Sequence, residues 1–188
     1  MRHICLMPSI RPSTHAAILE AAFQVFNDMP GASLAVIAER AGVGRATLHR
    51  HFASREDLLL AMAKAAHAEL TAAVDAAVAD AQSYTEGLRL AMAAIIPLAE
   101  RHMFLASQTL DHHPEMAEAE ARDRLDLISD IDKAKSEGLL DPNLPSSWIA
   151  ESYDALIYAG WAVVHRQEAT PRQAADMAWR SFLKGCQI

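Results

Sequence analysis

A tight turn at Gly42, between two short helix-forming segments, constrains the fold of this chain more than any other feature of its sequence. Before the turn, apolar residues recur with the spacing of one helix face, at Leu34, Ile37, Ala38 and Ala41. Glycine adopts a positive φ at little cost and can therefore end this helix, after which Val43 turns inward as a hydrophobic plug. The small side chain of Ala38 lets a second helix cross closely. The sequence thus predicts two helices packed as a corner around this glycine.

The second helix of this corner is expected over residues 45–51, with Leu48 and Phe52 facing inward. Its outward side chains are then Arg45, Thr47, His49 and Arg50. Residues 40–55 include four arginines and no acidic residue, although the whole chain carries a net charge of −7. Phosphate neutralisation supplies most of the non-specific affinity for nucleic acid, so a local basic patch on an acidic chain favours DNA binding. The alternative is a helical hairpin whose arginines only form a solvated face.

The segment from Ile18 to Met62 resembles the N-terminal domain of TetR-family transcriptional repressors. The matching stretches are ILEAAFQVF, IAERAGV, the helix that follows them, HF and SREDLL, and together they cover about the first third of the chain. The resemblance implies that Arg45 faces base edges and that Arg50 takes either a base or a backbone contact. It implies phosphate or sugar contacts from Thr47, His49, His51 and Arg55. It extends the expected DNA-binding set to Ser33, Gly44 and Ala46.

Three residues depart from the usual pattern of that family. Gly44 stands where serine or threonine usually caps the recognition helix, Ala46 where glycine is common, and His49 where tyrosine is usual. Glycine is a tolerable N-cap, but alanine adds a methyl group near DNA, and a histidine can gain a charge at mild acidity. Sequence preference therefore does not transfer from relatives. The alternative function is a helical dimer that senses a ligand or binds a protein and no longer reads DNA.

Composition predicts an all-α fold in two parts. Glycine numbers only seven, alanine is abundant, and alternating runs of valine, isoleucine and threonine are absent, so strands have little to form from. We expect a flexible arm over residues 1–12 and a helix-turn-helix DNA-binding domain over residues 13–58. Residues 59–188 are expected to form a larger helical domain for ligand binding and dimerisation.

Other function classes lack their sequence signals. The chain has no GxSxG, phosphate-loop or dinucleotide-binding glycine motif, so we expect neither enzymatic activity nor a cofactor. Asp111, His112 and His113, with His102 nearby, do not complete a coordination set, so no metal is expected. The apolar run near the N-terminus is too short for a signal peptide or a membrane span, which favours a cytoplasmic location without membrane contact.

Helix starts are marked by capping-box-like pairs, at Ser54 and Asp57, Ser83 and Glu86, and Thr170 and Gln173, with Pro171 suited to a first helical position. Helices are expected at about residues 54–80, 85–101, 103–111, 115–136, 147–166 and 171–185. Within residues 85–101, Pro97 is expected to kink the helix, because its ring clashes with the carbonyl of Ala93.

An effector site is expected in the middle of the chain, where large apolar residues and a few polar ones could line a cavity. The candidates are Met92, Ile96, Met103, Phe104, Gln108, His113, Tyr153, Ile157 and Trp161. Ordinary core packing is an equal alternative for these residues.

The last two expected helices carry small residues that allow close approach by another helix. The candidates for a dimer interface are Ala155, Ala159, Gly160, Ala174, Ala178 and Phe182. The alternative is burial inside one subunit, but the resemblance favours a homodimer built from such a helix pair. It implies a repressor that binds a palindromic double-stranded operator at half-sites about 34–36 Å apart and is released by a small apolar or aromatic effector. Residues 54–80 would then form the lever.

Overall fold

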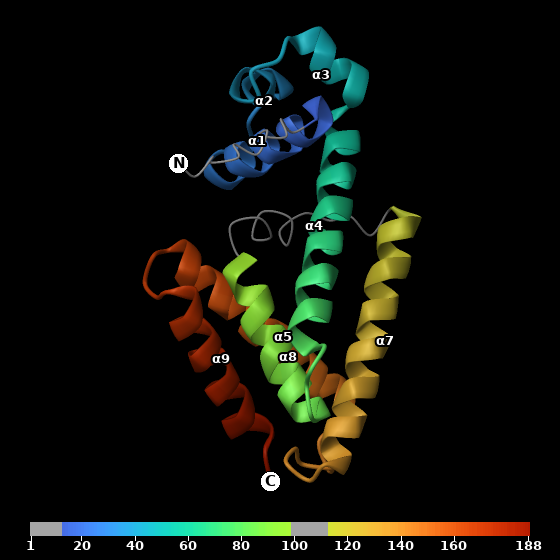
Figure 1. Cartoon of the computed structure of the whole chain (residues 1–188), viewed down its shortest axis with the longest axis vertical. Helices are drawn as coiled ribbons and strands as arrows, with labels where there is room; N and C mark the ends of the chain where they lie inside the picture. Colours follow the sequence, from blue (N-terminus) through green and yellow to red (C-terminus); the bar gives the residue numbers. More distant parts are fainter. Residues whose placement is uncertain (1–12, 99–112) are drawn as a thin grey trace, which may run out of the picture. The chain divides into compact units, whose positions relative to one another are not determined.

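The computed structural model of the chain describes residues 13–98 and 113–188, and within these ranges helices account for almost all regular structure. Figure 1 shows their order. The helices are α1 (Thr14–Asp28), α2 (Leu34–Arg40), α3 (Arg45–His51), α4 (Arg55–Val78), α5 (Tyr84–Ile95), the short 3-10 helix η1 (Ile96–Leu98), α7 (Pro114–Ser136), α8 (Ser146–His165) and α9 (Pro171–Cys186). The all-α fold is therefore confirmed. The expected arm over residues 1–12 and the expected helix over residues 103–111 lie outside the described residues.

The chain divides into two compact units, with the boundary between Leu58 and Leu59. By its residue range, α4 begins in the first unit and continues in the second. The core of the first unit contains Ile18 and Phe26 from α1 and Ile37 from α2, all fully buried. These residues recur at helical spacing, so each helix presents one apolar face to the core.

The corner at Gly42 has the expected conformation. Gly42 adopts a φ of 67°, and its N–H donates to the carbonyl of Glu39 at 3.0 Å. The N–H of Val43 donates to the carbonyl of Ala38 at 2.9 Å. This pair of bonds is the Schellman arrangement, which satisfies the last carbonyls of α2 and turns the chain into α3.

The core of the second unit is formed mainly by α5, α7, α8 and α9. The ring of Phe182 on α9 packs against that of Tyr153 on α8, with 5.5 Å between centroids, and against Trp179 at 5.3 Å. The hydroxyl of Tyr153 donates to the carbonyl of Leu88 on α5 at 2.6 Å. Burial raises the pKa of Tyr153, so the phenol stays a neutral donor that ties α8 to α5.

Helix starts in both units follow the capping pairs expected from sequence. Ser54 and Asp57 exchange two hydrogen bonds of 3.0 Å, and Thr170 and Gln173 form a complete capping box. The Ser83 hydroxyl accepts from the Glu86 N–H at 3.1 Å, as the hydroxyl of a capping box does.

The reciprocal bond at the start of α5 differs from a capping box. The Glu86 carboxylate accepts from the N–H of Gln82 rather than that of Ser83. Glu137, at the end of α7, instead accepts from the N–H groups of Tyr84 and Thr85 at 2.6 and 3.0 Å. A carboxylate from another helix thus helps to cap α5, and this long-range partner was not visible in local sequence spacing.

The expected helix over residues 85–101 is corrected at its C-terminal end. The α-helix ends at Ile95, and the chain continues through the 3-10 turn Ile96–Leu98 rather than as a kinked helix. Pro97 has no N–H to donate to the preceding turn, and its ring excludes α-helical packing against the carbonyl of Ala93. A tighter i→i+3 turn relieves both problems.

Candidate nucleic-acid interface

Helix α3 is anchored by apolar side chains on its inner side. Leu48 is 1% exposed and Phe52 is 3% exposed. The helix begins without a side-chain cap, because Gly44 at the N-cap has none to offer. The carbonyl of Gly44 instead accepts from the N–H groups of Thr47 and Leu48, each at 3.0 Å. The anchored face determines which side chains of α3 remain outside.

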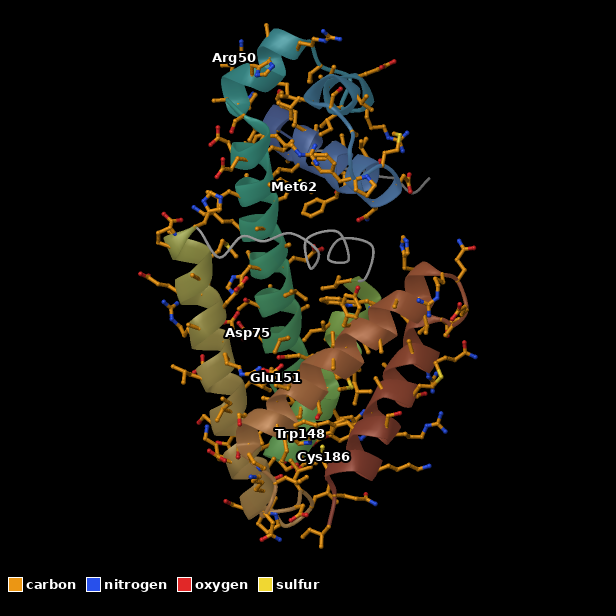
Figure 2. All side chains as sticks on the ribbon, turned by 180° about the vertical axis from the view of Figure 1, so that it is seen from behind. Arg50, Met62, Asp75, Trp148, Glu151 and Cys186 are labelled. Atoms are coloured by element: carbon orange, nitrogen blue, oxygen red, sulfur yellow. The ribbon has the colours of Figure 1, made fainter. Side chains whose placement is uncertain are left out.

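The outer side of α3 carries the basic residues expected there. Arg45, His49 and Arg50 are exposed, and Thr47 is half-buried beside them. Figure 2 shows Arg50 on this helix. A guanidinium can donate two parallel hydrogen bonds to O6 and N7 of guanine, whereas an imidazole or a hydroxyl suits single contacts to phosphate or sugar. The arrangement can therefore combine base recognition with backbone contacts.

The remaining expected contact residues lie in the same unit. Gly44 and Ala46 are exposed at the start of α3, and His51 is exposed at its end. Ser33 is exposed at the N-cap of α2, where its side chain makes no capping bond. These expected contact residues are thus all exposed in the unit that contains α3.

Arg55, the other expected phosphate contact, makes contacts inside the first unit. Its two terminal guanidinium nitrogens donate to the carbonyls of Ala32 and Pro30 at 2.7 and 2.6 Å. The guanidinium also lies over the ring of Phe26, 4.3 Å from its centroid. These contacts hold the guanidinium against the loop between α1 and α2. Arg55 therefore holds that loop to the start of α4, a role that sequence spacing did not reveal.

The candidate effector residues that the structure describes come together in the core of the second unit. Met92, Ile96, Tyr153 and Ile157 are buried there, and Trp161 packs against them. The Trp161 indole N–H donates to the carbonyl of Ile95 at 3.1 Å. Tyr153 and Trp161 thus use their polar atoms on backbone carbonyls of α5. His113 lies at the N-cap of α7, and the candidates Met103, Phe104 and Gln108 lie outside the described residues.

An open groove of the second unit was not expected from the sequence. Its volume is about 610 Å³, and it lies between the end of α5 and the start of α9. Its lining is Arg89, Ala93, Pro97, Thr170, Pro171, Arg172, Ala175 and Asp176. None of the candidate effector residues lines it.

Four of the six candidate dimer residues are used inside the subunit itself. The buried ones are Gly160, Ala174, Ala178 and Phe182. Only Ala155 and Ala159 are exposed. This burial has a packing reason: small residues on α8 and α9 let these two helices approach each other and α5 within one chain. Packing inside the subunit, the alternative that the sequence left open, thus accounts for these four residues.

Gly160 has the tightest of these contacts. A Cβ placed on Gly160 would lie 2.7 Å from Cδ1 and 3.1 Å from Cγ1 of Ile96, which is fully buried. We expect Gly160→Ala to lower the free energy of unfolding by about 1 kcal/mol, because overpacking exceeds the helix-forming advantage of alanine. Urea denaturation followed by circular dichroism measures this change.

Two further variants provide controls for Gly160. Gly87→Ala in α5 meets nothing closer than 4.0 Å and should raise stability by about 0.5–1 kcal/mol. In an Ile96→Ala background, Gly160→Ala should also become stabilising, because the atoms that it strikes are gone. An equal loss of stability in both backgrounds would contradict the contact with Ile96.

Residues 13–98 and 113–188 contain neither a membrane-spanning helix nor a metal-binding cluster. No helix there has both the length and the apolar character needed to cross a bilayer. In the same ranges, histidine, cysteine and carboxylate side chains form no cluster of three or more suited to a metal ion. Of the histidines and the aspartate considered above as metal ligands, only His113 lies within these ranges.

Comparison with known proteins agrees with this geometry. The family model described as bacterial regulatory proteins, tetR family, matches residues 18–62. The HTH-type transcriptional repressor LfrR of Mycolicibacterium smegmatis is 30% identical over 177 residues, which cover 93% of this chain and 91% of that protein. The similarity therefore spans both units rather than the helix-turn-helix alone.

Solved structures have the same fold. The crystal structure of LfrR from Mycobacterium smegmatis in complex with proflavine matches with a TM-score of 0.77 and 28% identity, covering 92% of this chain and 95% of that one. AibR in complex with isovaleryl coenzyme A and operator DNA matches with a TM-score of 0.75 and 21% identity, covering 88% and 96%. The similarity to AibR shows a common fold only. The exposed helix-turn-helix, the family model and the identity to LfrR together show that the chain belongs to the TetR family of bacterial transcriptional regulators and is not an enzyme.

Proposed function

We propose that the chain is a homodimeric repressor that binds a palindromic DNA operator and releases it when a small apolar or aromatic molecule binds to the second unit. The observation that carries this proposal is the exposed basic side of α3, formed by Arg45, His49 and Arg50 above the buried Leu48. A short helix anchored on one side and basic on the other fits the major groove of B-DNA.

In this proposal, different residues of the first unit make different contacts to DNA. Arg45 at the start of α3 reads a guanine, and Arg50 contacts either a base or the backbone. Phosphate and sugar contacts come from Thr47, His49 and His51, together with Ser33 at the start of α2. Gly44 and Ala46 allow or limit close approach of the helix backbone to DNA. The operator complex of AibR supports this mode for the fold.

The homodimer in this proposal uses the outer side of α8 and α9. Ala155 and Ala159 of α8 are exposed at helical spacing, and two large side chains of the same helix are also exposed. Trp148 is 60% exposed and Tyr158 is 50% exposed, and Figure 2 labels Trp148. Met177 on α9 is 40% exposed. Large apolar side chains alongside small ones suit packing against the same helices of a second copy.

The effector in this proposal is a small apolar or aromatic molecule bound near α5 and α8. The aromatic rings of Tyr153 and Trp161 lie there with apolar neighbours. The complex of LfrR with proflavine, a flat aromatic compound, supports this class of ligand. Such a molecule favours a conformer in which the two α3 helices are wrongly spaced for DNA, and α4 is the connecting element. It can lower DNA affinity by no more than the ratio of its own affinities for the two conformers.

Selection from a pool of random DNA duplexes tests the proposal. The purified protein is mixed with the pool at about physiological salt, and the retained duplexes are sequenced. We expect an enriched inverted repeat, because two recognition helices in a dimer read two half-sites. Weak, salt-sensitive binding without enrichment would favour instead a dimer that no longer reads DNA, as the departures at Ala46 and His49 allow.

A further inference from the structure

Two histidines from different helices stand together in the first unit. His15 lies in the first turn of α1 and His51 is the last residue of α3. Their ring centroids are 6.1 Å apart, with the rings at 68° to each other. Both side chains are exposed.

The position of His15 is set by the core beneath it. Its ring lies 5.0 Å from the ring of Phe52, which is buried and ends α3. Phe52 thus supports the imidazole of His15 from below, and His51 lies beside it. In the described part of the chain, neither imidazole nitrogen of His15 forms a hydrogen bond on which the fold depends. The ring of His15 therefore packs beside Phe52 while the side chain remains exposed.

We propose that His15 and His51 form a phosphate-binding pair that takes up protons when DNA binds. This inference rests on the proposed function, in which His51 contacts the backbone, and it adds α1 to the interface through His15. Imidazole is the side chain that gains a charge between about pH 8 and pH 5. A phosphate placed against both imidazoles favours their charged forms.

Other charges lie on the helices that carry the pair. Arg45, His49 and Arg50 are exposed on α3, as is His51, and they add positive charge that attracts a phosphate. Acidic residues also occur on these elements, at Glu20 on α1 and at Glu56 and Asp57 in the first turn of α4. The Asp57 carboxylate accepts from the N–H of Ser54, and the Arg55 guanidinium donates to the Ala32 and Pro30 carbonyls. In this proposal, the anion that meets both imidazoles is a phosphate of the DNA backbone.

Binding to DNA at two pH values tests this proposal. A random-sequence duplex is sufficient as the probe, because phosphate contacts do not depend on sequence. Fluorescence anisotropy at constant ionic strength should show tighter binding at about pH 6 than at about pH 8, by about fivefold or more. Titration calorimetry in buffers with different ionisation enthalpies should show net proton uptake.

Variants of His15 separate a contact from a structural role. His15→Gln should reduce the proton uptake and the pH dependence, with a smaller effect on affinity at about pH 8. His15→Lys should bind more tightly than His15→Gln at about pH 8, because lysine keeps its charge there. His165→Gln, at the exposed end of α8, is the matched control and should leave the proton uptake unchanged.

The outcomes distinguish this inference from the function on which it rests. If the protein binds the duplex equally well at both pH values, the inference is wrong and the proposed function stands. Proton uptake that is the same in His15→Gln as in the unmodified chain would also overturn it. If no duplex is bound at either pH, the proposed function itself fails.

Discussion

Replacing Arg45 by alanine should lower affinity for the selected operator by about 10- to 100-fold, while binding to random duplexes should fall much less. Arg45 is exposed at the first position of α3, where a guanidinium can pair with O6 and N7 of guanine. Such a bidentate pair contributes about 1–3 kcal/mol of discrimination against the wrong base. Competition binding of operator and mutated operators, measured by anisotropy, gives both affinities.

Two control variants sharpen the test of Arg45. Arg45→Lys keeps the charge but loses the planar fork, so it should restore non-specific binding and leave most of the specificity lost. Arg122→Ala removes an exposed arginine of α7, outside the first unit, and should change neither affinity by much. If Arg45→Ala weakens operator and random duplexes by the same factor, then Arg45 contacts the backbone and not a base.

Replacing Arg55 by alanine should lower the free energy of unfolding by about 2–4 kcal/mol, measured by urea denaturation. The substitution removes two charge-assisted hydrogen bonds to the carbonyls of Ala32 and Pro30 and the contact with the Phe26 ring. Hydrogen bonds from charged groups contribute about 1.5–3 kcal/mol each, and because this side chain is only partly buried, a loss near or somewhat below the low end of their sum is expected.

The controls for Arg55 separate stability from DNA contact. Arg50→Ala removes an exposed arginine of the same unit and should change the unfolding free energy by less than about 0.5 kcal/mol. Arg55→Lys should recover only part of the loss, because an ammonium cannot bond two carbonyls with the same fork geometry. An Arg55→Ala variant with unchanged stability but a salt slope of DNA binding smaller by about one would support the phosphate contact expected from sequence.

Local signals in the sequence predicted much of the DNA-binding unit. The bounds of α3, the positive φ at Gly42 and the reciprocal bonds between Ser54 and Asp57 all follow from residues within a few positions of one another. Each depends on local backbone geometry, which the neighbouring residues largely determine. The roles of individual side chains toward DNA stay predictions that the variants above test.

Long-range partners were the part that sequence spacing did not predict. Arg55 has the spacing of a surface residue, yet its guanidinium contacts carbonyls in the loop before α2. Glu137 belongs to α7 by sequence, yet it caps α5. Both contacts join segments that only the folded chain brings together. From local spacing alone, each side chain would be expected to contact solvent or a residue close to it in sequence.

The sequence by itself thus determined which segments become helices, where they begin and turn, and which faces are apolar or basic, because these depend on backbone preferences and on the helical period. The tertiary structure alone decided what each face meets. Gly160 and Phe182 lie on faces suited equally to a second subunit or to their own core, and the structure buries them in their own core. The helical period specifies the direction of a side chain from its own axis, but the identity of the partner depends on how all the helices fill space together.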